Sequence, residues 1–290
     1  SAFGLTAAAA MGLDVERLLK SAESMVRSCK ATNPNENPGT ILGNILGVCH
    51  REGRDKLTLF TPPEFYDLGA WLEQLIAEST GKNGLSIIPV DRETLQSADM
   101  YGDDRVFVNF TLKGAKVDEE TLADLADIAE SHPMVNIELT DKYSLGQEFF
   151  RWEFATAVAG SIMGINPFDQ PDVESAKIEA KKITESYELS GALPPEEPFF
   201  TEDGISLFTK ADYAAELANA ADEKSLAGYL EAHLWNLGEK DYFALLAYVE
   251  MDQEHEDILQ QIRSHVFEHY SVATCLGFGP RFLHSTGQAY

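Results

Sequence analysis

The sequence is poor in three features, each of which is typical of a different class of protein. Its 3 cysteines, Cys29, Cys49 and Cys275, are widely spaced, which argues against a structural zinc site and favours a reduced, cytoplasmic protein. No apolar run approaches the roughly 20 residues that a membrane-spanning helix needs. Lys and Arg number 22 against 48 Asp and Glu. The resulting net charge of -26 argues against nucleic acid and anionic membrane surfaces as partners.

The chain instead alternates apolar, strand-like segments with helix-like segments. Its pattern predicts strands at residues 56–60, 85–90, 105–110, 134–139, 242–249 and 271–276. It predicts helices at 5–30, 39–51, 64–79, 118–131, 144–163, 171–189, 211–219, 223–236 and 254–269, and a loop at 190–209. Strands interleaved with helices predict an α/β fold, in which a parallel sheet is flanked by helices.

A first group of polar residues lies at the end of the predicted helix 64–79. Gln74 and Glu78 are four residues apart and share a helix face. Gly81 suits a C-cap, so Glu78 should lie in the last turn, where the helix dipole and partial burial make a carboxylate a better general base. The alternative is that Glu78 is a solvated acid with Lys82 as its surface partner, and spacing alone favours this alternative.

Two further groups could contribute to a site. Gln170 and Lys177 are seven residues apart, nearly two helical turns, so in a helix they share a face. The alternative for Lys177, as for Lys181 and Lys182, is a solvated basic face. His284 follows the last predicted strand, where it could position substrate hydroxyls, shuttle protons or bond to the backbone.

These segments resemble motifs of the phosphoglucose isomerases. The run from Gln74 to Lys82 resembles the Glu-Ser-(Asn/Thr)-Gly-Lys motif that carries the base of that family. The run 165–177 resembles its Asn-x-Phe-Asp-Gln motif with a downstream lysine, departing from it at 171–172 and 175–176. His284-Ser-Thr-Gly-Gln resembles a third family stretch. The order of these motifs resembles that in the isomerase half of bifunctional transaldolase–phosphoglucose isomerase fusions.

The resemblance implies a fold, a domain division and a reaction. The fold is the three-layer sugar isomerase sandwich, with residues 1–54 as a helical link to an upstream domain and 55–290 as a second such domain, cut short at its C-terminal end. The reaction is the interconversion of glucose 6-phosphate and fructose 6-phosphate through a cis-enediol, in glycolysis and gluconeogenesis, and within a fusion also in the pentose phosphate pathway. A homodimer and further segments of the same polypeptide are expected partners.

The resemblance also assigns roles to the residues. Glu78 is the base, Lys177 and Gln170 hold the ring oxygen or the phosphate, Gln74 orients a hydroxyl or Glu78 itself, and His284 contacts substrate. Neither a metal nor an organic cofactor is required, since one positioned base with electrostatic support suffices. The net charge repels a sugar phosphate, so we expect the anion-binding part of the site to lie outside this chain. The resemblance likewise implies that the phosphate loop lies upstream of this chain and the ring-opening histidine downstream of it.

Other interpretations remain open. The chain could be a non-catalytic phosphosugar-binding module or an inactive fragment of the enzyme. His265 and His269, four residues apart, could share a metal with acidic residues at the start of the same predicted helix. The alternative is that those acids simply suit the dipole at the helix N-terminus. Lys177 could form a Schiff base only if it were buried, and the neighbouring Glu174 and Glu179 argue against burial.

Overall fold

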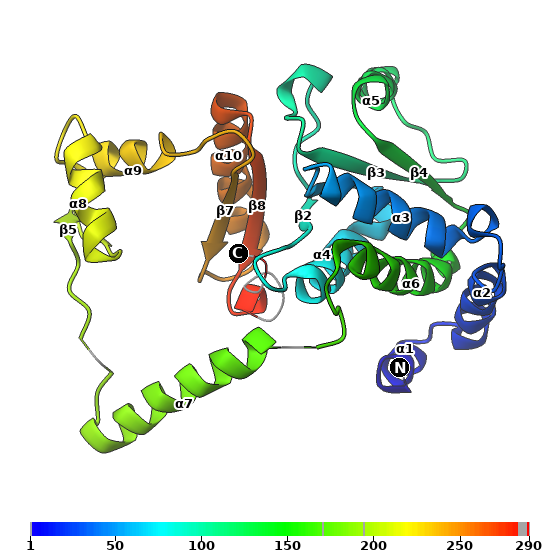
Figure 1. The fold of residues 1–290 in the computed structure, drawn as a ribbon, viewed down its shortest axis with the longest axis horizontal. Coiled ribbons are helices and arrows are strands. Elements are labelled where there is room, and N and C mark those ends of the chain that lie inside the picture. The colour runs from blue at the N-terminus through cyan, green and yellow to red at the C-terminus, as the bar shows by residue number, and fades with distance from the viewer. Residues whose placement is uncertain (1, 170, 194, 284–288, 290) are drawn as a thin grey trace. The chain divides into compact units, whose positions relative to one another are not determined.

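The computed structural model describes residues 2–169, 171–193, 195–283 and 289, with the backbone alone for 171–176 (Figure 1). The chain forms two compact units. The first comprises residues 1–169 and 243–290, and the second comprises residues 170–242. The first unit is therefore discontinuous in sequence. The predicted division into a helical segment 1–54 and a domain 55–290 stays a prediction.

The first unit begins with helices α1 (Ala2–Ala10), α2 (Val15–Ser28) and α3 (Pro38–Arg51). It continues through β1 (Lys56–Phe60), α4 (Tyr66–Thr80), β2 (Ile88–Asp91), β3 (Arg105–Leu112), α5 (Glu119–Ser131), β4 (Met134–Leu139) and α6 (Leu145–Met163). After the second unit come β7 (Tyr242–Ala247), α10 (Gln253–Tyr270) and β8 (Ala273–Phe278).

Strands β1 to β4 form a parallel sheet in the order β2-β1-β3-β4. Lys56 at the start of the inner strand β1 lies opposite Ile88 on one side and Arg105 on the other. Strands β7 and β8 pair with each other, and β8 lies beside β2, where the Cys275 thiol donates to the carbonyl oxygen of Pro89 at 3.5 Å. The predicted parallel sheet with flanking helices is thus confirmed.

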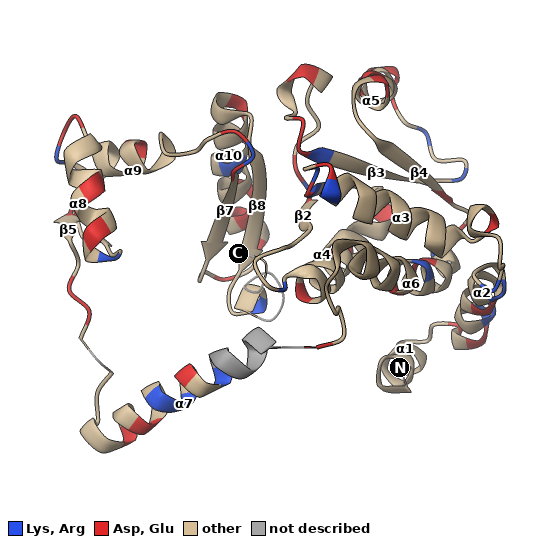
Figure 2. Cartoon of the chain, viewed as in Figure 1, with Lys and Arg blue, Asp and Glu red and all other residues tan. Residues whose placement is uncertain are grey.

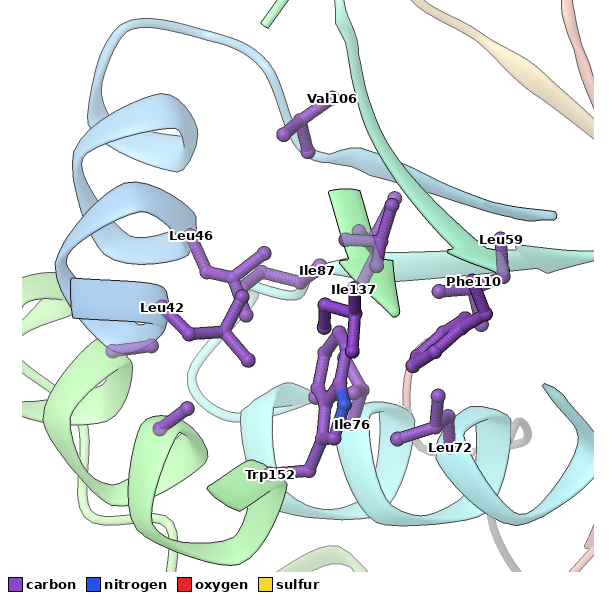
Figure 3. Close-up of a cluster of buried hydrophobic side chains, with 14 of the residues drawn as sticks. Leu42, Leu46, Leu59, Leu72, Ile76, Ile87, Val106, Phe110, Ile137 and Trp152 are labelled. Carbon is purple, nitrogen blue, oxygen red and sulfur yellow. The ribbon is translucent and has the colours of Figure 1, made fainter. Parts of the chain in front are cut away.

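The strands present alternate side chains to two helical layers, as the pleat requires. Val106, Val108 and Phe110 of β3 face α3, α4 and α6, and pack there with the fully buried Trp152 of α6 (Figure 3). Phe107, between them, faces α5 and α10 and packs against Ile128 and Phe267. Removing such side chains from water is the main stabilising term of an α/β sandwich.

A buried polar network fastens β8 to the sheet. The Glu93 carboxylate, 5% exposed, accepts hydrogen bonds from the Thr274 backbone N–H at 2.8 Å and from its hydroxyl at 2.9 Å. It also pairs with Arg105 on β3. Arg263 of α10 donates to the Thr274 hydroxyl at 2.9 Å. Because buried charges are costly unless they are paired, this network specifies where β8 and α10 attach.

The structure departs from the predicted single helix 5–30. The helix breaks at Gly12, whose φ of 82° is a conformation that glycine adopts readily. Asp14 then caps the start of α2 by accepting a hydrogen bond from the Arg17 backbone N–H at 3.0 Å. Two helices therefore replace the predicted one.

The second unit comprises α7 (Pro171–Ser190), β5 (Phe200–Glu202), β6 (Ile205–Leu207), α8 (Ala211–Ala220) and α9 (Leu226–Leu234). Leu217, Tyr229 and Ala232 form its core. The predicted loop 190–209 contains the antiparallel hairpin β5–β6, which turns at Asp203 and Gly204, both with positive φ. Asp-Gly is a strong hairpin signal, but strands of three residues are too short to show the alternation that predicts a strand.

Acidic side chains are spread over helices of both units, including α2, α5 and α8 (Figure 2). Across the described ranges, the structure has no helix that is both long and apolar enough to cross a bilayer.

Candidate active site

The end of α4 is fixed to the entry of β2. The Gly81 backbone N–H donates to the carbonyl oxygen of Ala77 at 2.9 Å, and Gly81 is the C-cap of α4, as predicted. The buried Thr80 hydroxyl donates to Ile76 O at 2.7 Å and accepts from the Ile87 N–H at 3.0 Å. Glu78 therefore lies on a helical turn whose backbone is fixed by hydrogen bonds within α4 and to the segment that enters β2.

Lys82 is buried beneath that turn, with 2% of its surface exposed. Its Nζ donates a hydrogen bond to the backbone carbonyl oxygen of Glu78. Lys82 and Leu85 exchange two backbone hydrogen bonds of 2.9 Å around Asn83 and Gly84, which both have positive φ. Lys82 therefore does not lie at the surface, as the alternative interpretation of this motif assumed. Its ammonium satisfies an end-of-helix carbonyl, where the dipole favours a cation.

Gln74 and Glu78 both lie on α4 and share a face, as predicted. Gln74 is exposed and Glu78 is partly buried. Helix α4 runs from the carboxyl end of β1 back to the start of β2, so Glu78 lies at the amino-terminal edge of the sheet. Ligands of open α/β sheets usually bind at the opposite, carboxyl edge. The general rule for ligand sites would therefore not have pointed to Glu78, which was predicted as a site residue from its motif.

The structure describes one of the three other predicted site residues. Lys177 is exposed on α7 in the second unit. Lys181 and Lys182, farther along α7, make exposed ion pairs with Glu185 and Glu179, which agrees with a solvated face. Gln170 and His284 lie outside the described residues. Of the five predicted site residues, the structure thus places Gln74 and Glu78 together on one element.

Sequence reasoning missed a pair of carboxylates formed by Glu73 on α4 and Asp91 on β2. Asp91 ends β2, and its carboxylate lies directly over Gly69, where an added Cβ would come within 1.8 Å of Asp91 Oδ1. Burial raises the pKa of Asp91 above its usual range. Burial, and then the negative charge of Asp91, raise the pKa of Glu73 to about 7. A glycine inside a helix signals such a close approach, and Gly69 was that signal.

Arg92 links these carboxylates to α10. Its Nε donates to Asp91 Oδ2 at 3.1 Å and its Nη1 donates to Glu256 Oε1 at 2.8 Å. The Tyr66 hydroxyl donates to the same Glu256 oxygen at 2.6 Å. The positive charge of Arg92 is therefore matched by two carboxylates.

The histidine pair on α10 gives little support to a metal site. The His265 and His269 rings lie 4.0 Å apart between centroids, and His269 Nδ1 lies 2.8 Å from the backbone oxygen of His265. Within the part of the chain that the structure describes, no group of three or more His, Cys, Asp or Glu side chains is arranged to hold a metal ion.

Comparison with known proteins identifies glucose-6-phosphate isomerases among the relatives of this chain. The glucose-6-phosphate isomerase of Clostridioides difficile is 28% identical over 214 residues, which is 61% of this chain and 48% of that protein. A probable glucose-6-phosphate isomerase of Methanococcus maripaludis is 27% identical over 209 residues, with shares of 61% and 48%. The glucose-6-phosphate isomerase of Enterococcus faecalis is 27% identical over 212 residues, with shares of 60% and 47%.

The chain therefore spans about half the length of the curated relatives it matches. A scan against models of protein families found no match.

Proposed function

We propose that this chain, which is related to the phosphoglucose isomerases, forms the base-bearing part of an enzyme that interconverts glucose 6-phosphate and fructose 6-phosphate. The observation that carries the proposal is the placement of Glu78. Its carboxylate stands in the last turn of α4, on a backbone fixed by Thr80, Gly81 and Lys82, within a motif that resembles the base-bearing motif of that family.

In the proposed reaction Glu78 acts as a carboxylate on the open-chain sugar. It removes the proton from C2 of the aldose, and the electron pair moves to the carbonyl oxygen O1, which takes up a proton from solvent to give a cis-enediol. Glu78 then returns its proton to C1, and the O2 hydroxyl releases a proton to solvent as the ketone forms. One fixed carboxylate thus serves both carbons, and solvent exchanges the two oxygen-bound protons. We assign Gln74, on the same helix face, to orient Glu78 or a substrate hydroxyl.

The enzyme must bind the phosphate group of its substrate despite a net charge of -26 on this chain. Lys82 is buried and bonded to a backbone oxygen, so we assign the anion to other groups. Lys177 and Gln170 are proposed to hold the ring oxygen or phosphate, and His284 a hydroxyl. Since the relatives are about twice as long as the matched region, we propose that other segments of the polypeptide or a second copy supply the rest. A transaldolase fusion is one such source.

The direct test is Glu78→Gln in the intact source protein. Transfer of the C2 proton of glucose 6-phosphate is followed in heavy water by NMR, alongside turnover. Glu78→Gln should retain binding and lose turnover and exchange by about two to four orders of magnitude. Asp67→Asn, at the exposed start of α4, serves as the matched control and should retain both. Near-normal turnover in Glu78→Gln would exclude Glu78 as the base, and binding without exchange in the unmodified protein would favour a phosphosugar-binding module.

A further inference from the structure

A cavity of about 520 Å³ lies at the opposite edge of the sheet from Glu78. Its floor is the carboxyl ends of β1 and β3, at Phe60, Thr61, Asn109 and Thr111. In the order β2-β1-β3-β4 the chain goes from β1 to one neighbour and then returns to the other, so β1 and β3 flank the topological switch point. That crevice is where doubly wound sheets bind ligands.

Helix α5 covers this cavity incompletely. Near its C-terminal end Ile128 is fully buried against the sheet. Toward its start, Leu122 and Val117 are 52% and 40% exposed and line the cavity together with Leu125. Apolar side chains that the fold leaves uncovered around a hollow indicate an apolar occupant.

The charged residues and turns around the cavity are poorly suited to a phosphate. Arg92 and Lys116 line the cavity, but so do Glu64, Glu93 and Asp118, and Arg92 is bound to Asp91 and Glu256. The turn after β1 contains Pro62 and Pro63, which have no N–H to donate, and Glu64, which repels anions. The α5 N-terminus is already occupied by Asp118, which accepts from the Thr121 N–H at 2.8 Å and from its hydroxyl at 2.9 Å. The carboxylates around the cavity, the two prolines and the Asp118 cap therefore disfavour phosphate binding at these helix starts.

The polar groups on the floor suit a neutral ligand. The Asn109 side-chain nitrogen donates to Asn136 Oδ1 at 3.0 Å, across the β3–β4 pair. An asparagine amide has a second N–H and an oxygen, so it can also meet a donor–acceptor edge. Thr61 and Thr111 add hydroxyls beside it.

From these observations we propose that the cavity at the ends of β1 and β3 binds an uncharged nucleoside. Its heterocycle packs between Phe60 and the α5 residues Leu122 and Leu125, with its polar edge on Asn109. The threonine hydroxyls meet the ribose. Pockets of 300–1,000 Å³ with apolar walls and a few polar groups are typical of such ligands. The site is independent of the proposed isomerase reaction.

The test uses adenosine, guanosine, cytidine and uridine as probes of the intact chain, each at about 1 mM, by saturation-transfer NMR with titration calorimetry. At least one nucleoside should bind. Leu122→Trp, which fills the cavity, and Asn109→Ala, which removes the amide, should each weaken binding by about tenfold or more. Ala123→Trp, at an exposed neighbouring position of α5 outside the cavity lining, should leave binding unchanged. Circular dichroism and thermal unfolding establish that each variant is folded.

Several results would overturn the proposal. One is that none of the four nucleosides binds. Another is that a nucleoside binds a folded Leu122→Trp variant as tightly as it binds the original chain. A third is that Leu122→Trp alters the sedimentation coefficient while no nucleoside binds, because the cavity would then be part of a protein–protein interface.

Discussion

The Glu93 carboxylate accepts hydrogen bonds from both terminal nitrogens of Arg105, at 2.8 and 3.2 Å, in a bidentate pair that is almost completely removed from water. Glu93 follows β2 and Arg105 begins β3, so the pair joins two segments around the sheet. Thr274 of β8 binds the same carboxylate. The attachment of β8 and α10 therefore depends on one glutamate.

Replacing that glutamate should be costly. Glu93→Ala leaves Arg105 buried without its counter-charge and the Thr274 N–H without its acceptor, so we expect the free energy of unfolding to fall by about 3–5 kcal/mol. Urea denaturation measures the loss. The double variant Glu93→Leu/Arg105→Met, which removes both charges, should recover much of it. A loss below about 1 kcal/mol in Glu93→Ala would show that the pair contributes little.

Gly69 should tolerate no side chain while Asp91 is present. A Cβ at position 69 would overlap Asp91 Oδ1 and force the carboxylate off Arg92, so Gly69→Ala should destabilise the protein by about 2–3 kcal/mol. In an Asp91→Ala background the same change should cost nothing, because alanine favours the helix. Gly4→Ala in α1, where the added Cβ meets open space, is the control. Additive effects of the two changes would contradict this coupling.

Glu73 should make stability depend on pH. Its pKa is raised from 4.5 to about 7 in the folded protein, so folding takes up a proton between these values. The free energy of unfolding therefore falls as the pH rises through this window. Glu73→Gln, which mimics the protonated acid, should be near neutral at pH 5 and stabilising by about 1–3 kcal/mol at pH 8.

Urea denaturation of Glu73→Gln at the two pH values tests this expectation. Asp67→Asn, on the exposed start of α4, provides the comparison and should not shift the dependence in this direction. Equal effects of Glu73→Gln at both pH values would mean that Glu73 titrates alike in the folded and unfolded chain.

Lys82 should support Glu78 through the backbone. Lys82→Met removes the buried donor to the Glu78 carbonyl oxygen, which costs about 1–3 kcal/mol of stability. If Glu78 is the base, small displacements also lower kcat, by up to about 100-fold, with less effect on KM. Steady-state kinetics of the intact protein measure both constants. Lys113→Met, at an exposed position, is the control. A folded Lys82→Met variant with unchanged kcat would exclude this positioning role.

The sheet and most of the helices were predictable because local signals agree with the packing. Val106, Val108 and Phe110 alternate with other residues at the period of a strand, and the structure buries them on one face. Pro38 begins α3 where the proline and the asparagine cap before it indicate a helix start. The break at Gly12 was missed because apolar residues on both sides continue the helical pattern.

The candidate site was predictable only in part. Spacing put Gln74 and Glu78 on one face, but only the motif gave Glu78 a role. A lysine just after a helix is usually solvated, so the burial of Lys82 required knowledge of the turn at Asn83 and Gly84. The environment of Glu73 depends on Asp91, which reaches α4 only after the chain has entered the sheet. Such contacts arise from tertiary packing, and the only sign of this one in the sequence is the glycine at position 69 of α4.

The insertion of residues 170–242 has a consequence for how the chain is made. Synthesis proceeds from the N-terminus, so β1 to β4 emerge from the ribosome before any part of β8 has been translated. Until then β2 is an uncovered edge strand, and the Glu93 carboxylate does not yet have the hydrogen bond that the Thr274 N–H donates to it. Open edges pair readily with other chains. The nascent protein therefore passes through a stage at which it needs protection from aggregation, and the length of the insertion sets how long that stage lasts.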